Sequence, residues 1–174
     1  NNFSFINFYE RRARRILPAL FFIILISTIV AYLFYLPSSL VFFSKSIFSS
    51  LVFISNIFFW KSSVVYNAEG SAFLPLLHTW SLSVEEQYYI IFPIIVIVLY
   101  KLSKKILLNS LIFLLTVSLF LASWASLNYS GANFYILITR FWEILFGSLI
   151  AYFEILEKNK FDTASKNKFL LFVS

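Results

Sequence analysis

The sequence predicts an all-α membrane protein, a polytopic bundle of four spanning helices plus one re-entrant or interfacial segment. Three observations support this prediction. Hydrophobic residues make up 60% of the 174 and charged residues only 13%, whereas soluble domains have about 45–50% and about 25%. Several apolar runs reach the roughly 20 residues that cross a bilayer. The basic residues stand between these runs, as in the loops of a multi-pass protein.

The apolar segments are expected at 16–36, 40–60, 83–100, 106–127 and 134–153. Four of them are predicted to span the membrane. The segment 40–60 is the exception, because it contains Lys45 and five serines. Residues 1–157 form one partial membrane domain, and 158–174 form a cytoplasmic loop and the start of a further helix. There is no Met, even at position 1, so we expect an internal fragment of a longer protein.

The distribution of basic residues decides whether 40–60 crosses. Lys and Arg collect on the cytoplasmic side, and a non-crossing segment places eleven of the fourteen basic residues there. The segment is therefore expected to enter and leave on the outer face, with the acidic residues near position 85 at the outer end of the next helix. A fifth ordinary span is the alternative. The eleven are Arg11, Arg12, Arg14, Arg15, Lys101, Lys104, Lys105, Lys158, Lys160, Lys166 and Lys168.

Composition also excludes several classes of function. The net charge is +6 and the pI about 9.6, but the basic residues do not form the stripe that a nucleic-acid surface needs. We therefore expect membrane lipid, and no nucleic acid, as a partner. The chain has no Cys and one His, which excludes thiol catalysis and a Cys-ligated or His-rich metal site within it.

Four arginines precede the first apolar run: Arg11, Arg12, Arg14 and Arg15. We expect them just ahead of a cytoplasmic helix start, with Pro18 in the first turn of that helix. Arginine side chains bind phosphate through two parallel hydrogen bonds, and a helix N-terminus adds partial positive charge. A phosphate-rich cytosolic ligand and simple anchoring to anionic lipid both explain this cluster.

The most polar stretch between apolar runs contains His78, Trp80, Glu85 and Glu86. Ser83 and Glu86 have the spacing of a capping box, in which two side chains satisfy the N–H groups of a helix start. That motif leaves the second carboxylate and the imidazole unexplained, and such groups together orient or deprotonate a hydroxyl. A belt of interfacial rings is the plainer interpretation of His78 and Trp80.

Arg140 and Glu143 lie one helical turn apart inside an apolar run. A charge near the middle of a membrane costs about 2.5–3.5 kcal/mol on insertion scales, so such residues usually face the bundle interior and pair with each other. The two residues are therefore expected to interact. A structural lock and the wall of a functional site are both open interpretations.

Three segments carry a family resemblance. They are FYERRARRILP at 8–18, HTWSLSVEEQYY at 78–89, and TRFWE at 139–143 followed by Gly147. Together they resemble the acyltransferase-3 family of integral membrane O-acyltransferases, over essentially all 174 residues. The second segment is the most specific, although Tyr88 stands where the family usually has Phe.

The resemblance implies transfer of an acyl group, acetyl in particular, from cytosolic acyl-CoA to a hydroxyl of a cell-envelope polysaccharide or lipid-linked sugar. This would take place in the bacterial inner membrane. Arg12 and Arg15 match the two motif arginines and would hold the CoA phosphates, and Glu85 and Glu86 would line the transfer site. The family's catalytic His lies on its first transmembrane helix, upstream of this chain. His78 belongs to another motif and has only a supporting role, so the chain alone should be inactive.

Two other classes of function are compatible with the residues alone. In a transporter or flippase, Arg140, Glu143 and the two adjacent acids would line a substrate path. Weak inverted symmetry across a longer chain would favour that class. The third class is a non-catalytic membrane scaffold.

Overall fold

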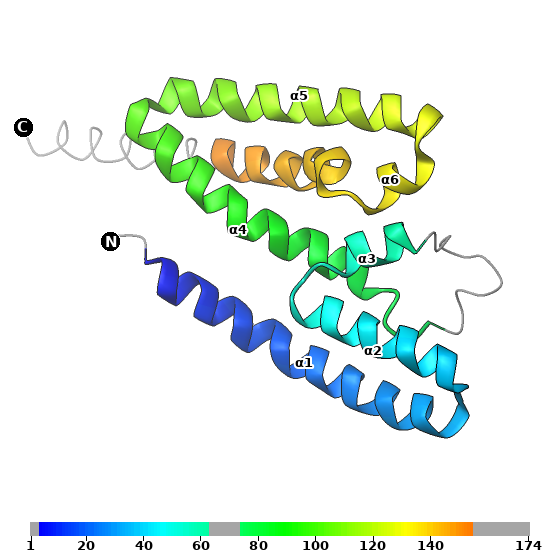
Figure 1. Cartoon of the computed structure of the whole chain (residues 1–174). Helices are drawn as coiled ribbons and strands as arrows, with labels where there is room; N and C mark the ends of the chain where they lie inside the picture. The colour runs from blue at the N-terminus through cyan, green and yellow to red at the C-terminus, as the bar shows by residue number, and fades with distance from the viewer. Residues whose placement is uncertain (1–3, 63–73, 155–174) are drawn as a thin grey trace, which may run out of the picture. The chain divides into compact units, whose positions relative to one another are not determined.

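The computed structural model describes residues 4–62 and 74–154, and every regular element in these ranges is a helix (Figure 1). The helices are α1 (Phe5–Phe34), α2 (Pro37–Leu51), α3 (Ser55–Lys61), α4 (Thr79–Leu102), α5 (Lys104–Asn128) and α6 (Ser130–Tyr135). A further helix at 137–154, called the final helix below, follows α6. The predicted loop and helix start at 158–174 lie outside the described residues.

Within the described residues, four helical stretches are long and apolar enough to cross a membrane: Phe5–Phe34, Thr79–Leu102, Lys104–Asn128 and Ser130–Glu154. The last of these comprises α6 and the final helix. Only 11% of the most apolar stretch of α1 is buried, and 28% of that of α4. Helices that expose apolar side chains on most sides are suited to lipid and not to water. The predicted fold class, an all-α multi-pass membrane protein with four spanning helices, is confirmed.

The first helix begins eleven residues earlier than the predicted run at 16–36. Ser4 caps it by accepting a hydrogen bond from the Asn7 amide at 3.4 Å. The arginines therefore lie on the helix, and Pro18 lies in its interior, where proline cannot donate to the Arg14 carbonyl. The predictions that the arginines precede the helix and that Pro18 occupies its first turn were wrong. The apolar run marks the lipid-facing part of α1, which is shorter than the helix.

The chain divides into two compact units, Asn1–Glu86 and Gln87–Ser174, and α4 continues from one into the other. In the first unit, α1 and α2 lie side by side and run in opposite directions (Figure 1). Ala31, Phe43 and Leu76 form one buried apolar cluster of this unit. The cluster therefore joins α1, α2 and the turn before α4.

Residues 40–60 form a helical hairpin in place of one span. By helix rise, α2 is about 22 Å long and α3 about 10 Å, and a span needs about 30 Å. Between them Phe53 has a φ of 55°, a left-handed conformation that bulky residues seldom adopt. The Phe42 and Phe58 rings are consequently 5.1 Å apart, whereas one straight helix would separate them by about 24 Å. This is the form expected of a re-entrant segment.

Hydroxyl groups join the helices of the second unit. Ser118 on α5 donates to the Ile138 carbonyl at 2.6 Å and accepts from the Trp142 amide at 3.0 Å on the final helix. The Tyr88 hydroxyl on α4 lies 2.8 Å from Ser148 Oγ on the final helix, and Tyr88 is only 1% exposed. The Tyr88 hydroxyl is therefore used in helix packing.

We expect both ends of the α2–α3 hairpin to lie on the same side of the membrane. Single cysteines at Ser38 and Ser62, in a full-length protein without other accessible cysteines, should therefore react alike with an impermeant thiol reagent added from outside. Labelling of only one position would show that the segment crosses.

Tyr88→Phe should lower the free energy of unfolding by about 0.5–1.5 kcal/mol, the net value of one hydrogen bond. The loss is modest because Ser148 Oγ also donates to the Ile144 carbonyl at 3.2 Å and keeps that partner. Tyr129→Phe is the matched control, since Tyr129 is 60% exposed, and should change stability much less. Unfolding of the purified protein in detergent measures both, and equal losses would contradict the assigned role of Tyr88.

Candidate active site

An ion pair between Arg12 on α1 and Glu86 on α4 is the central polar feature of the first unit. Arg12 Nε and Nη2 donate to Glu86 Oε1 at 3.2 and 3.0 Å. The two side chains are only 18% and 10% exposed. Charges in such surroundings need a partner, because an uncompensated one is costly. The structure thus brings the predicted phosphate-binding motif and the predicted acidic motif together.

The capping-box prediction for Ser83 and Glu86 was wrong. α4 begins at Thr79, so the backbone of Ser83 is already inside the helix and has no unsatisfied N–H group of a helix start. The Ser83 hydroxyl is instead 2.7 Å from Ser55 Oγ, and Glu86 pairs with Arg12. Partners distant in sequence have replaced the local one.

The predicted depth of Glu86 was also wrong. The sequence placed it at the outer end of its helix, across the membrane from the arginines. Arg12 lies 22 residues before the end of α1 at Phe34, which is about 33 Å of helix. A contact of 3.0 Å with Arg12 therefore places Glu86 toward the arginine end of α1. Charge counting assigns loops to sides but does not fix the depth of a residue inside a helix.

The other arginines of the cluster differ in their surroundings. Arg14 pairs with Glu10 at 2.7 Å, and this Arg14 side chain is 79% exposed. Arg11 and Arg15 are exposed, and neither makes a hydrogen bond or ion pair with a described residue. They stand four residues apart and so share a helix face. Arg11 and Arg15, more than Arg12, therefore present guanidinium groups to an external anion.

A chain of buried hydroxyls reaches Ser83, which lies one helical turn before Glu86 on α4. The Thr79 hydroxyl lies 2.8 Å from Ser50 Oγ and 3.0 Å from Ser55 Oγ. Ser55 in turn lies 2.7 Å from Ser83 Oγ, and all four residues are at most 2% exposed. This network ties the α2–α3 hairpin to α4, and the sequence analysis did not identify it. Its signal in the sequence is the serine content of the hairpin, which also counts against a span.

The other predicted site residues do not join this pair. His78 is exposed in the turn before α4, and its carbonyl accepts a hydrogen bond from Ser81 Oγ at 3.1 Å. Trp80 is buried, with 8% exposed, and so is not an interfacial belt residue. Glu85 is exposed and makes no hydrogen bond or ion pair with a described residue. Across residues 4–62 and 74–154, no three His, Cys, Asp or Glu side chains converge as metal ligands would.

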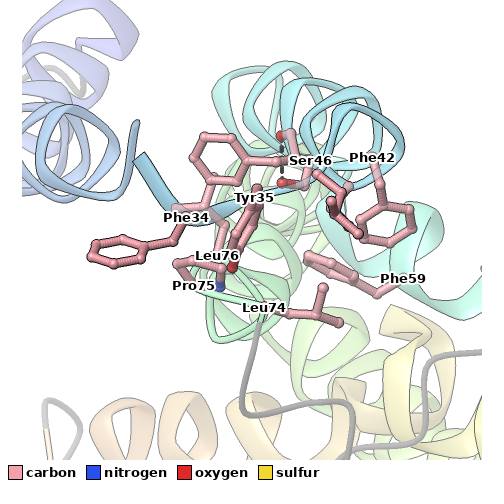
Figure 2. A pocket seen from close by; sticks show the side chains of 11 residues that line it. Phe34, Tyr35, Phe42, Ser46, Phe59, Leu74, Pro75 and Leu76 are labelled. Atoms are coloured by element: carbon pink, nitrogen blue, oxygen red, sulfur yellow. Dashed lines mark hydrogen bonds between the residues drawn. The ribbon is translucent and has the colours of Figure 1, made fainter. Parts of the chain in front are cut away.

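An apolar pocket of about 560 Å³ lies at the end of α1 that is remote from Arg12 (Figure 2). Its walls come from the end of α1, both helices of the hairpin and the turn before α4. Aromatic and aliphatic side chains dominate, and the polar exceptions are the hydroxyls of Tyr35, Ser39 and Ser46. None of the described residues that line it is charged, so this part of its wall suits an apolar group. The labelled residues are Phe34, Tyr35, Phe42, Ser46, Phe59, Leu74, Pro75 and Leu76.

Arg140 and Glu143 form the predicted pair in the second unit. Arg140 Nη2 and Nε each lie 3.2 Å from Glu143 Oε1, and the guanidinium stands over the Phe134 ring at 5.3 Å. The side chains are 27% and 44% exposed, and both line a second pocket of about 260 Å³. The contact between the two residues is confirmed.

Comparison with known proteins supplies the family. The acyltransferase domain of the acyltransferase-3 family matches residues 1–174. An uncharacterized protein of Haemophilus influenzae is 32% identical over 162 residues, which cover 87% of this chain and 64% of that protein. O-acetyltransferase OatA of Staphylococcus aureus (strain NCTC 8325) is 26% identical over 155 residues, covering 84% of this chain and 24% of OatA. No solved structure matches the chain.

The chain therefore spans less than two thirds of the length of each of these relatives. The family match, in contrast, extends over the entire sequence and includes the Arg12–Glu86 pair and the Arg140–Glu143 pair. The segments that resemble the family are thus the ones that place charged side chains inside an apolar bundle. On this evidence the chain belongs to the acyltransferase-3 family of membrane acyltransferases.

Proposed function

We propose that this chain contributes to the transfer of an acyl group, acetyl in particular, from cytosolic acyl-CoA to a hydroxyl of a cell-envelope polysaccharide or lipid-linked sugar. The bacterial inner membrane is the proposed location. The observation that carries the proposal is the Arg12–Glu86 contact. It joins a basic cluster suited to the phosphates of CoA to a carboxylate suited to a hydroxyl, within one unit of an acyltransferase-family protein.

The proposed reaction moves the acyl group from the thioester sulfur of CoA to the hydroxyl oxygen of the acceptor. The acceptor oxygen attacks the thioester carbonyl, a C–O bond forms, and the C–S bond breaks. The hydroxyl proton passes to a general base, and the CoA sulfur leaves and takes up a proton. By the family resemblance the base is a His on a helix upstream of this chain, so the residues here bind and orient and do not supply the base.

Arg11 and Arg15 are the proposed contacts for the CoA phosphates. Both are exposed on one face of α1, and a guanidinium matches the geometry of a phosphate with two parallel hydrogen bonds. This assignment modifies the expectation from the resemblance, which had used Arg12 together with Arg15. Arg12 is already engaged by Glu86.

Glu86 is proposed to orient the acceptor hydroxyl. Its Oε1 accepts both hydrogen bonds from Arg12, and its Oε2 accepts none from a described residue. Arg12 thereby fixes the carboxylate and leaves one oxygen for a substrate hydroxyl. Glu85, about 100° around the helix, is exposed within a spanning helix. A carboxylate is costly against lipid, so we place Glu85 against water or the polar acceptor.

Arg12 and Glu86 should behave as one unit in stability measurements. Glu86→Gln or Arg12→Met alone should cost about 3–5 kcal/mol, because each leaves the other charge buried without its partner. The double variant Arg12→Met with Glu86→Gln should be less destabilised than the sum of these two singles and should still lack acyl transfer. Unfolding in detergent and acyl transfer by membranes with the full-length protein give the two readouts.

The Glu10–Arg14 pair is the matched control for this cycle. It also joins an arginine to a glutamate, but both of its residues lie on α1 and are largely exposed. Exposed pairs within one helix contribute about 0.3–0.5 kcal/mol. Glu10→Gln and Arg14→Met should therefore change stability and activity little. Additive losses for Arg12 and Glu86, or losses of equal size at the control pair, would refute the assignment.

Arg11→Ala and Arg15→Ala should each raise the KM for acyl-CoA about 10-fold or more, since a hydrogen bond to a charged group is worth about 1.5–3 kcal/mol. Lys at either position should restore only part of the affinity, because it lacks the two-pronged geometry. Arg14→Ala is the control and should leave the KM unchanged. Complete rescue by Lys would show that the arginines act as general positive charge.

A further inference from the structure

A small polar pocket lies within the second unit, where α5 ends, α6 turns and the final helix begins. Its volume is about 260 Å³. One bound water needs only about 10–15 Å³ of such space, so the pocket is large enough for a ligand of the size of one monosaccharide ring. Polar side chains contribute much of its wall: Ser126, Ser130, Asn133, Arg140, Trp142 and Glu143.

The charges in this pocket are already paired. Arg140 and Glu143 lie 3.2 Å apart, and the Arg140 guanidinium also stands over the Phe134 ring. An anion entering the pocket would meet the Glu143 carboxylate as well as the guanidinium, and like charges repel. The pocket therefore favours an uncharged polar ligand over a phosphate or carboxylate.

Several polar atoms of the pocket have no partner among the described residues. Asn133 Oδ1 is fully buried and accepts no hydrogen bond. No described residue bonds to Glu143 Oε2, the Ser130 hydroxyl or the Trp142 indole N–H. Only Asn133 Oδ1 is buried, and a buried polar atom is normally satisfied, so this one calls for a partner. The other three atoms belong to exposed or partly exposed side chains and are open to a ligand. These atoms include both donors and acceptors, which a ligand with several hydroxyls satisfies at once, because each hydroxyl donates and accepts.

Hydrogen bonds to the backbone of Asn133 fix the position of this residue. The Thr139 hydroxyl donates to the Asn133 backbone carbonyl at 3.0 Å, and the Asn133 backbone N–H donates to the Tyr129 carbonyl at 2.9 Å. The first bond connects α6 to the final helix, and the second lies within α6 and its N-cap. The unsatisfied Oδ1 therefore belongs to a well-anchored residue on the wall of the pocket.

We propose that this pocket binds one uncharged sugar ring of the acceptor, through the Asn133 amide, the Glu143 carboxylate and the half-buried Trp142 ring. The proposal rests on the proposed function for the chemical class of its ligand. Polar side chains would bind the ring hydroxyls, and the Trp142 ring would contact the C–H face of the sugar. Asn133, Trp142 and Glu143 are thus specificity residues for the acceptor and do not touch the acyl donor.

Asn133→Leu separates a binding role from a structural one. Leucine has a similar size and removes the unsatisfied buried acceptor, so the variant should have an equal or higher Tm and should bind sugar at least 10-fold more weakly. Asn128→Leu is the matched control. Asn128 is exposed, donates to the Trp124 carbonyl at 2.9 Å and does not line the pocket, so sugar binding should be unchanged. If Asn133→Leu fails to fold, Asn133→Ala tests binding in its place.

Binding is measured by saturation-transfer NMR on the purified full-length protein, with methyl glucoside and methyl N-acetylglucosaminide as millimolar probes. A signal from wild type and Asn128→Leu that is lost in Asn133→Leu supports the proposal. Displacement of the probe by inorganic phosphate, or equal signals from all three proteins, would overturn it. A lower Tm for Asn133→Leu with unchanged binding would assign Asn133 a structural role instead.

Kinetics separate this proposal from the proposed function. With acyl transfer by the full-length protein in membranes, Asn133→Leu should raise the KM for the acceptor at least 10-fold and leave the KM for acyl-CoA unchanged. If wild type transfers acyl groups and Asn133→Leu keeps the wild-type acceptor KM, the sugar pocket is wrong and the proposed function stands. If wild type binds the probes but transfers no acyl group to any sugar, the proposed function is wrong while the pocket stands.

Discussion

The contact between Arg12 and Glu86 constrains the first unit more than any other interaction. Both charges lie among helices whose outer surfaces are apolar, where an uncompensated charge is costly. The pair therefore requires the first polar turns of α4 to pack against α1. That placement leaves Thr79 and Ser83 facing inward, and their hydroxyls need partners of their own. The α2–α3 hairpin supplies these partners through Ser50 and Ser55.

The same requirement explains why the hairpin is rich in serine. Ser46, Ser49 and Ser50 each donate to a carbonyl one turn earlier in α2, so their hydroxyls are satisfied within the helix. These bonds make a polar helix compatible with an apolar environment. The break at Phe53 then turns α3 back along α2 and brings Ser55 to Thr79. Serine content, which counts against a spanning segment, is here what connects a hairpin to its neighbours.

Part of this structure could be predicted from the sequence, and the physical reason differs for each part. The four spans were predictable because transfer into lipid depends on about 20 consecutive residues. The Arg140–Glu143 contact was predictable because both residues lie on one helical turn. The Arg12–Glu86 contact joins residues 74 positions apart, so each motif could be identified but not their pairing. The capping box failed for the same reason, since tertiary partners of Ser83 and Glu86 outweighed their local spacing.

Two kinds of polar group can be distinguished inside the described helices, those that bond to one another and those that have no partner. The second kind indicates where a ligand could bind. The hydroxyls of Ser50, Ser55, Thr79 and Ser83 bond to one another and are as buried as the apolar core, so they hold helices together. Glu86 Oε2 and Asn133 Oδ1 have no partner among the described residues, although hydrogen bonds hold the Glu86 carboxylate and the Asn133 backbone in place. Inside a membrane such atoms are costly unless something donates to them. An acceptor that is anchored but unsatisfied is therefore best explained by a donor supplied from outside the helices, and a ligand hydroxyl is the donor common to both positions.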